Sequence, residues 1–256
     1  MPEPRISALI VARNEAENLP GCLDSVAFAD ERVVVVDSRS DDATLEIARA
    51  RADVVAVRDF DDFAGQRNAG RAMASGDWIL SIDADERVTP GLAGEIRRAI
   101  RDADSSGLVG FRLPIRSEIL GRPFGYSGTQ QDIPLRLFRR GLGAWTGQVH
   151  ETVAISGPIG RMSGFLTHRT LPSMQAFLGK IDHYTTLEAS DLYRAGERFR
   201  ASDLAARPFW VFLKLYLAKQ GFRDGLEGLM FCALSGLSVA VRTWKLREID
   251  LAKGAA

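Results

Sequence analysis

The first hundred residues alternate between short apolar runs and longer segments of mixed polarity. The runs are rich in valine, isoleucine and leucine, as is typical of strands covered on both faces of a parallel sheet. They predict strands at residues 5–11, 31–37, 53–57 and 77–82. The segments between and after them predict helices at residues 18–29, 43–51, 63–75 and 90–104. Because strands that alternate with helices form parallel sheets with helices on both faces, the predicted fold class is α/β with a doubly wound, mostly parallel sheet.

The pattern changes near Gly107. A mixture of strands and loops is predicted there, with strands at residues 109–115, 135–138, 149–155 and 163–168. After Pro172 the chain becomes helical, with helices predicted at residues 173–194, 207–220 and 225–248. We therefore expect an α/β domain over about residues 1–170 and a helical C-terminal region over residues 171–256.

Composition narrows the class of protein. The chain has 256 residues, of which 46% are hydrophobic and 26% charged, as in ordinary soluble globular proteins. Lys and Arg number 33, as do Asp and Glu, so no overall basic excess favours a nucleic-acid partner. Two cysteines make no disulfide framework. The apolar run at residues 7–12 is short, and Asn14 and Glu15 follow it at once, which argues against a signal peptide. These features predict a cytoplasmic protein.

One strand end carries the main candidate site. The apolar strand at residues 77–82 runs directly into Asp83 and Asp85, which lie two residues apart and so point the same way in extended backbone. Two carboxylates in this position can bind a divalent cation together with phosphate oxygens. Ligands of open α/β sheets bind at this edge. Since Asp-x-Asp is also common in acidic loops, the assignment depends on other motifs. The sequence contains no Gly-x-Gly-x-x-Gly and no Walker lysine loop.

Several motifs occur in a fixed order along the chain. They are Asn14-Glu15 after the first strand, residues 37–44 after the second, Gln66-Arg67-Asn68, Asp83-Ala84-Asp85-Glu86, Arg136 to Arg140, and His150-Glu151. Together they resemble inverting family 2 glycosyltransferases with the GT-A fold. The closer resemblance is to bacterial β-1,4-glucosyltransferases of the lipopolysaccharide inner core. It covers about residues 5 to 170 well and the helical tail more loosely. One departure lies at residues 128–132, where the family often has Gly-Trp and a proline before the aspartate.

The resemblance implies a role for each motif. A nucleotide-sugar donor would be held by Asn14, Glu15, Asp37, Ser40, Arg67 and Asp83. Asp85 and His150 would hold a metal, Mg²⁺ or Mn²⁺, with Glu151 orienting the histidine ring. Asp132 would be the catalytic general base. Glu86, His168 and His183 are assigned structural roles.

Most of these assignments have a plainer alternative. Asp37 can cap the following helix, or serve as the phosphoacceptor of a receiver domain, although a receiver domain needs an acidic pair where Asn14-Glu15 supplies one acid. Arg67 can be an ordinary surface arginine, and Asp132 an ordinary loop residue. His150 can contact the diphosphate instead of a metal. The arginines at positions 136, 139 and 140 face either acceptor phosphates or solvent.

The activity that the resemblance implies is a metal-dependent, inverting transfer of a hexose. The donor would be UDP-glucose, and the acceptor a lipid-linked oligosaccharide such as the lipopolysaccharide inner core. Two other classes stay open. One is a nucleotidyltransferase, which normally carries a loop rich in glycine and arginine after the first strand. The other is a non-catalytic nucleotide-sugar-binding protein.

Two apolar stretches in the tail bear on the partners of the protein. Residues 209–218 are apolar nearly all round, as in helices that lie in a membrane interface, and basic residues flank or interrupt them. Residues 226–244 form a longer run, which is borderline for the roughly 20 apolar residues that a membrane span needs. Contact with the inner face of the cytoplasmic membrane is therefore one expectation, and burial against the α/β domain is the alternative.

Overall fold

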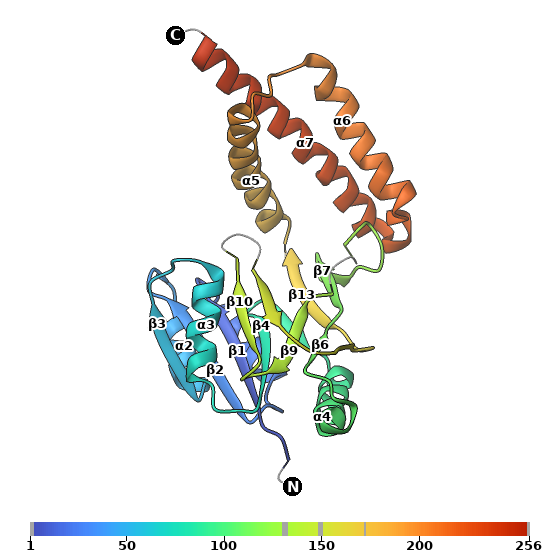
Figure 1. Ribbon diagram of the computed structural model, residues 1–256. Coiled ribbons are helices and arrows are strands. Elements are labelled where there is room, and N and C mark those ends of the chain that lie inside the picture. Colours follow the sequence, from blue (N-terminus) through green and yellow to red (C-terminus); the bar gives the residue numbers. More distant parts are fainter. Residues whose placement is uncertain (1–2, 130–132, 148–150, 172, 255–256) are drawn as a thin grey trace. The chain divides into compact units, whose positions relative to one another are not determined.

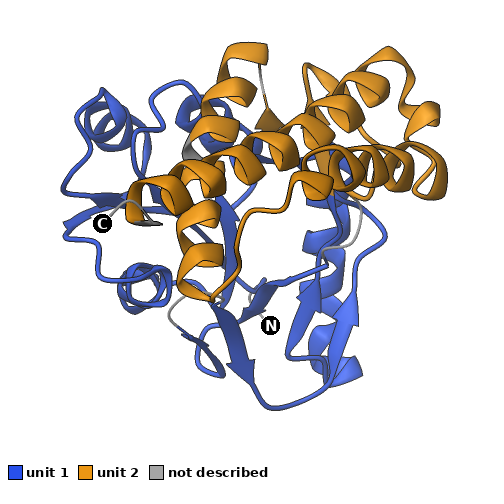
Figure 2. Cartoon of the chain, turned by 90° about the horizontal axis from the view of Figure 1, so that it is seen from above, with its two compact units in different colours: residues 1–115, 132–168 blue, residues 116–131, 169–256 orange. Residues whose placement is uncertain are grey.

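The structure is a computed structural model that describes residues 3–129, 133–147, 151–171 and 173–254. It divides into two compact units, which Figure 2 colours separately. Unit 1 comprises residues 1–115 and 132–168, and unit 2 comprises residues 116–131 and 169–256. Unit 2 thus combines the C-terminal helices with a segment from the middle of the chain, whereas the sequence prediction draws one boundary near residue 170.

Unit 1 is built on a seven-stranded sheet with the strand order β12-β6-β9-β4-β1-β2-β3. In its first half, strands β1 to β4 are parallel and alternate with helices, as predicted (Figure 1). These elements are β1 (Ile6–Ala12), α1 (Leu19–Ser25), β2 (Glu31–Asp37), α2 (Thr44–Arg51), β3 (Val54–Arg58), α3 (Phe63–Met73), β4 (Trp78–Asp83) and α4 (Pro90–Ser106).

The second half of unit 1 adds short strands. Strand β9 lies between β4 and β6 and is antiparallel to both, so the sheet is mixed at this side. The strands are β5 (Glu86–Val88), β6 (Gly110–Arg112), β9 (Leu135–Arg139), β10 (Gly143–Thr146), β11 (Thr152–Ile155), β12 (Ile159–Arg161) and the first part of β13 (Leu166–Leu171).

Both faces of the central sheet are buried, which explains the continuous apolar runs. On β1, Ile6, Ala8 and Ile10 belong to one core cluster and Leu9 belongs to the other. Helices α1, α2 and α4 cover the first face, and α3 with β10 covers the second. Helix α3 approaches the sheet closely at Gly70, where an added Cβ would lie 2.2 Å from a methyl group of Leu9. This packing fixes the strand ends that form the candidate site.

The predicted strands of the second half differ in detail from those of the structure. The strand predicted at residues 109–115 is two strands, β6 and β7 (Ile115–Ile119), because Pro114 between them has no N–H to donate to a ladder. The strand predicted at residues 163–168 lies three residues later, as β13. Strands β5, β8, β10 and β12 are not among those predicted, since runs of two to four residues carry too little periodicity.

Unit 2 consists of a short hairpin and a group of helices. Its elements are β7, β8 (Arg122–Pro123), α5 (Met174–Arg194), α6 (Ala201–Leu213), the π-helical turn η1 (Lys214–Ala218), the 3₁₀ turn η2 (Gly221–Asp224) and α7 (Gly225–Gly254). Helix α6 begins about two turns before the predicted residue 207, and Pro208 lies inside it. An ion pair of 2.9 Å between Asp203 and Arg207, one turn apart, supports the additional turns.

Candidate active site

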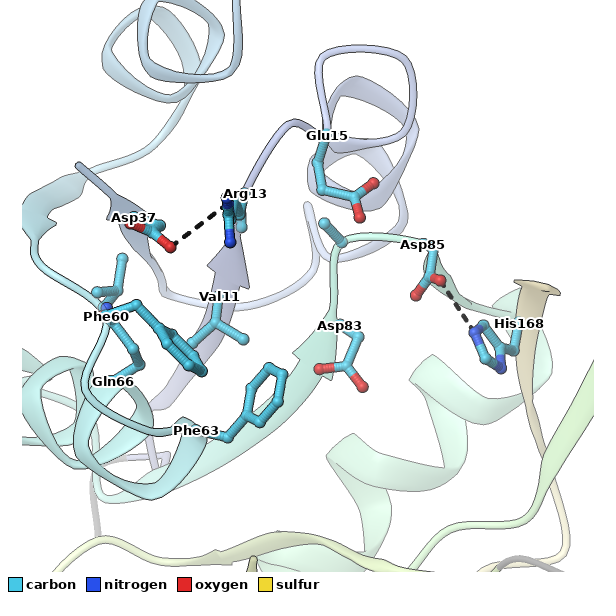
Figure 3. A pocket seen from close by; sticks show the side chains of 13 residues that line it. Val11, Arg13, Glu15, Asp37, Phe60, Phe63, Gln66, Asp83, Asp85 and His168 are labelled. Atoms are coloured by element: carbon cyan, nitrogen blue, oxygen red, sulfur yellow. Dashed lines mark hydrogen bonds and ion pairs between the residues drawn. The ribbon is translucent and has the colours of Figure 1, made fainter. Parts of the chain in front are cut away.

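The carboxyl ends of β1, β2 and β4 meet at one edge of the sheet of unit 1. Strand pairing places Val11 opposite Asp83 and Ala12 opposite Val36, so the loops after these strands open side by side. They surround a pocket of about 350 Å³, shown in Figure 3. Its polar and aromatic lining residues are Arg13, Glu15, Asp37, Phe60, Phe63, Gln66, Asp83, Asp85 and His168.

Asp37, the last residue of β2, lies at one side of the pocket (Figure 3). Its carboxylate accepts hydrogen bonds from Arg39 Nε and Nη2 at 3.1 and 2.9 Å, and Arg13 Nε lies 3.6 Å away. The hydrogen bonds from Arg39 lower the pKa of Asp37 below its ordinary value, more than its burial raises it. The rings of Phe60 and Phe63 stand edge to face at 5.0 Å beside it. A buried carboxylate next to aromatic rings suits a nucleoside.

Asn14 and Ser40 connect the loops that follow β1 and β2. Asn14 has a φ of 54°, and its side-chain oxygen accepts a hydrogen bond from the backbone N–H of Asp41 at 3.0 Å. Its own N–H donates to Ser40 Oγ at 3.4 Å. The next N–H, that of Glu15, donates to Thr44 Oγ1 at 2.7 Å. Asn14, Glu15 and Ser40 therefore hold the two loops together through these hydrogen bonds. Glu15 also lines the pocket.

Two arginines bracket Asp83. Arg67 Nη2 donates to one carboxylate oxygen at 2.6 Å, and Arg136 Nη2 donates to the other at 2.9 Å. Arg67 is only 5% exposed and also donates to Ser81 and to Glu151, at 3.0 and 3.3 Å. Burial alone would raise the pKa of Asp83, but the charges of Arg136 and Arg67 outweigh it, and the pKa is lowered. Asp83 is therefore an ionised carboxylate with a fixed orientation.

Glu86 lies beneath this group and is 1% exposed. It accepts a hydrogen bond from the backbone N–H of Asp83 and one from Arg136 Nη2, both at 2.8 Å. The pKa of Glu86 is raised, mainly because burial disfavours its charged form. The positive charge of Arg136 opposes this increase, and the negative charge of Asp83 adds to it. These contacts hold the backbone of Asp83 and the guanidinium of Arg136 in place.

Asp85 faces His168 across the other side of the pocket (Figure 3). His168 Nε2 lies 3.0 Å from Asp85 Oδ2. The antiparallel pairing of β5 with β13 brings His168 opposite Glu86 and so next to the Asp-x-Asp segment. Burial of the ring favours its neutral form, but the hydrogen bond and the charge of Asp85 outweigh it, so the pKa of His168 is raised.

A second cavity, of about 580 Å³, adjoins Asp83. Its polar lining comes from Arg67, Arg112, Arg136 and Glu151, and Trp145 adds an aromatic surface. Asp83 also lines the first pocket, so this carboxylate stands between the two. Unit 1 thus offers two adjacent compartments, as a reaction between two substrates needs.

Comparison with known proteins decides the family. The sequence model of the family described as "Glycosyl transferase family 2" matches residues 7–154, which is more than half of the chain. The chain belongs to this family. As a family 2 glycosyltransferase it has the GT-A fold, in agreement with the parallel sheet and flanking helices of unit 1 and with the fold class predicted from the sequence.

Relatives of this glycosyltransferase match it over nearly its full length. A glycosyltransferase of Rickettsia typhi, named as uncharacterised, is 25% identical over 96% of this chain and 88% of its own. The lipopolysaccharide core biosynthesis glycosyltransferase LpsC of Rhizobium meliloti is 29% identical over 90% of this chain and 87% of its own. Among solved structures, S. aureus TarS 1-349 in complex with UDP-GlcNAc aligns over 98% of this chain and 92% of its own, with 14% identity and a TM-score of 0.47.

The motifs that this protein shares with its family imply a divalent metal. Among the described residues, no group of three His, Cys, Asp or Glu side chains is arranged to hold one. Asp85 and His168 nevertheless place one carboxylate oxygen and one ring nitrogen next to each other at the pocket. A small hard cation that keeps several waters and takes substrate phosphates as further ligands needs few protein donors. The carboxylate of Asp85 fits such an ion, and His168 can add its ring nitrogen only when the ring is neutral.

The site residues predicted from the sequence have different outcomes in the structure. Asp37, Asp83, Asp85 and Glu15 line the first pocket, and Arg67 lines the second cavity. Asp132 and His150 lie outside the described residues. Their assignments remain predictions.

Sequence reasoning misses two contributors to the site. His168 is assigned a structural role, yet it lines the pocket beside Asp85. Arg136 is expected at acceptor phosphates or in solvent, yet it contacts Asp83 and Glu86. No local pattern in the sequence reports the place of His168, because the strand that pairs with it, β5, has only three residues.

Proposed function

We propose that this protein is an inverting glycosyltransferase that moves glucose from UDP-glucose onto a lipid-linked oligosaccharide such as the lipopolysaccharide inner core. Family membership supports glycosyl transfer, and the likeness to LpsC over most of both chains supports a core acceptor. The observation that carries the donor assignment is the pocket at the ends of β1, β2 and β4. It has a buried aspartate and aromatic rings at one side and the Asp85–His168 pair at the other (Figure 3).

The nucleoside of the donor would lie against Asp37. A carboxylate at this edge accepts hydrogen bonds from a ribose or from a uracil imide, as acidic residues do in dinucleotide folds. Phe60 and Phe63 supply the flat apolar surface that a base prefers. Asn14, Glu15 and Ser40 hold the loops in place through the contacts described above.

The ribose and the diphosphate of the donor would lie along the segment from Asp83 to Asp85. We propose that Asp83 accepts from the ribose, in the orientation that Arg67 and Arg136 give it. Asp85 would hold Mg²⁺ or Mn²⁺, with a ring nitrogen of His168 or of the predicted His150 as a second donor. When bound, the metal would supply positive charge that stabilises the departing diphosphate.

The acceptor would enter the second cavity, which borders the first at Asp83. We propose Asp132 as the general base that takes the proton of the attacking hydroxyl, while the bond between the anomeric carbon and the diphosphate oxygen breaks. Ile133, the next residue, lines this cavity. Glu151 is the rival, but its carboxylate already accepts a hydrogen bond from Arg67 Nε at 3.3 Å, which holds it against that arginine.

A panel of nucleotide sugars tests the proposal. The purified full chain is mixed with each nucleotide sugar and with Mg²⁺, Mn²⁺ or a chelator. The product released, a nucleoside diphosphate or pyrophosphate, is then identified. We expect UDP from UDP-glucose, released only with metal and faster when a heptose-containing core oligosaccharide is added. Release of pyrophosphate would identify a nucleotidyltransferase instead. Binding of UDP-glucose with no release in the presence of the acceptor would identify a non-catalytic binding protein.

A further inference from the structure

Helix α7 of unit 2 carries a line of exposed apolar side chains. Leu226, Met230, Leu237, Trp244 and Leu251 are 69, 36, 48, 45 and 62% exposed. They follow one another at intervals of four and then seven residues, which returns each side chain to the same face of an α-helix. At 1.5 Å per residue, this apolar stripe is about 37 Å long.

The opposite face of α7 is occupied by the other helices of unit 2. Helices α5 and α6 both pack against α7. Cys232, Thr243 and Leu246 are buried on that face. Gly236 approaches α6 so closely that an added Cβ would lie 2.8 Å from the carbonyl oxygen of Pro208. The helix is therefore anchored along one side, and its apolar stripe points away from the packing that anchors it.

The segment that leads into α7 adds exposed aromatic and basic side chains. Phe209, Trp210 and Phe222 are 63, 67 and 50% exposed. Lys214, Lys219 and Arg223 lie among them in the sequence. Aromatic rings with basic neighbours on a surface helix are typical of segments that lie at the boundary between lipid headgroups and acyl chains.

Charge differs sharply between the two units. Unit 2 contains 15 Lys and Arg against 10 Asp and Glu, and unit 1 contains 18 against 23, although the whole chain is neutral. A positive unit is attracted to an anionic surface and repelled by a second copy of itself. Pairing of two α7 stripes as a coiled coil is also disfavoured, because the positions that would complete its seam are Ala233, Ala240 and Arg247.

We propose that unit 2 binds the surface of an anionic lipid bilayer, with α7 lying in the plane of the membrane and its apolar stripe inserted below the headgroups. The helix from Gly221 to Lys253 is long and apolar enough to cross a membrane by length and composition. However, its packed face carries Arg242 and Lys245, which pair with Glu188 and Asp182 of α5 at 3.0 and 2.8 Å. Crossing the bilayer would break these pairs, whereas lying in its plane keeps them. This inference does not rest on the proposed function, because every residue it uses belongs to unit 2.

Intrinsic fluorescence gives a direct test with the full-length protein. Of the four tryptophans, Trp78 and Trp145 are buried in unit 1, while Trp210 and Trp244 are exposed in unit 2. Vesicles of phosphatidylglycerol and phosphatidylcholine should shift the emission to shorter wavelength and carry the protein into the pellet, and vesicles of phosphatidylcholine alone should do so much less. Trp244→Phe should remove a large part of the shift if α7 itself inserts.

A matched pair of variants separates the stripe from general surface polarity. Leu237→Glu on the stripe should lower partitioning into anionic vesicles several-fold, since lipid would bury the exposed half of this leucine and would repel the added carboxylate. Leu142→Glu, at an equally exposed leucine of unit 1, should leave partitioning unchanged. Equal losses in both variants, or equal binding to neutral vesicles, would overturn the proposal. So would a spectral shift that depends on protein concentration without lipid, which would show that a second copy covers the stripe. Measuring release of UDP from UDP-glucose in the same samples keeps this outcome separate from the proposed function.

Discussion

The two units bury their apolar residues in different ways. In unit 1, strands β1, β2 and β4 are apolar over most of their length and buried on both faces of the sheet. In unit 2, α7 also carries a long apolar run, but one of its faces is packed and the opposite face is exposed. The same kind of sequence thus makes a closed core in one unit and an open surface in the other.

This difference shows where each unit interacts with other molecules. Because strands β1, β2 and β4 are covered on both faces, the polar groups that they offer to ligands lie at the strand ends. Those groups are ordered by ion pairs such as Arg67 with Asp83. Unit 2 has a small pocket lined by charged residues, and its distinctive feature is the exposed apolar stripe. Variants at the strand ends should therefore change the rate of catalysis, and variants on α7 should change the binding of the protein to a lipid bilayer.

The largest effect is expected from Asp132→Asn. An acceptor hydroxyl is a poor nucleophile at neutral pH, and a positioned carboxylate that takes its proton typically contributes about 10²–10⁴-fold. The transfer rate should fall by at least the lower end of this range, with unchanged affinity for UDP-glucose. Glu151→Gln should lose less activity, or lose donor affinity as well, because Glu151 is bound to Arg67. Near-normal turnover of Asp132→Asn would move the base elsewhere. Donor affinity and turnover of both variants are the measurements.

Asp85→Asn should affect the donor and not the fold. Loss of one anionic ligand should weaken the metal-dependent part of UDP binding by at least about tenfold, since even removal of a residue that only orients a ligand costs 10–100-fold. Calorimetric titration of UDP with and without Mn²⁺ measures it. Asp41→Asn, at an exposed aspartate in the loop after β2, is the control and should bind UDP normally. Unchanged metal-dependent binding by Asp85→Asn would refute the assignment.

The parts of the molecule that could be predicted from the sequence are those with local periodicity. Strand β2 is predicted at its observed residues, because the run from Val33 to Val36 between polar ends has one plausible interpretation. The place of Asp37 at the ligand edge follows from this strand, and that of Asp83 and Asp85 from the strand predicted at residues 77–82, because residues at the ends of parallel strands lie at that edge. The pairing of His168 with Asp85 spans 83 residues of sequence and depends on a three-residue strand, so no local pattern reports it.

A pair of identical substitutions measures the difference in burial itself. Leu80 of β4 is fully buried, and Leu237 of α7 is 48% exposed. Leu80→Ala should lower the free energy of unfolding by about 2–5 kcal/mol, because it removes buried methyl groups and leaves a cavity. Leu237→Ala should change it by no more than about 0.5 kcal/mol. Denaturant titrations of the two variants give the comparison. A large loss for Leu237→Ala would mean that the stripe is part of a core, which would also contradict its role at a membrane.

The smallest effect is expected from His168→Gln, and it should be visible in the pH dependence of stability. The pKa of His168 is raised in the folded protein by Asp85, so the folded state binds a proton more tightly than the unfolded state does. This pairing stabilises the fold fully below the unfolded pKa of about 6.5, and its contribution is lost as the pH rises through the higher folded value. Glu86, with a raised pKa, acts in the same direction, so the wild type alone does not isolate the histidine. The difference in unfolding free energy between wild type and His168→Gln should therefore shrink as the pH rises, by less than about 1 kcal/mol for a partly exposed pair.

The unfolding free energies are measured in the presence of a chelator, so that no metal binds to Asp85 or His168. Lys245→Met, which removes the ion pair with Asp182 in unit 2, is the control and should show a pH-independent difference over the same range, because it leaves His168 and Asp85 in place. A parallel slope for His168→Gln and the wild type would show that the ring is uncharged beside Asp85.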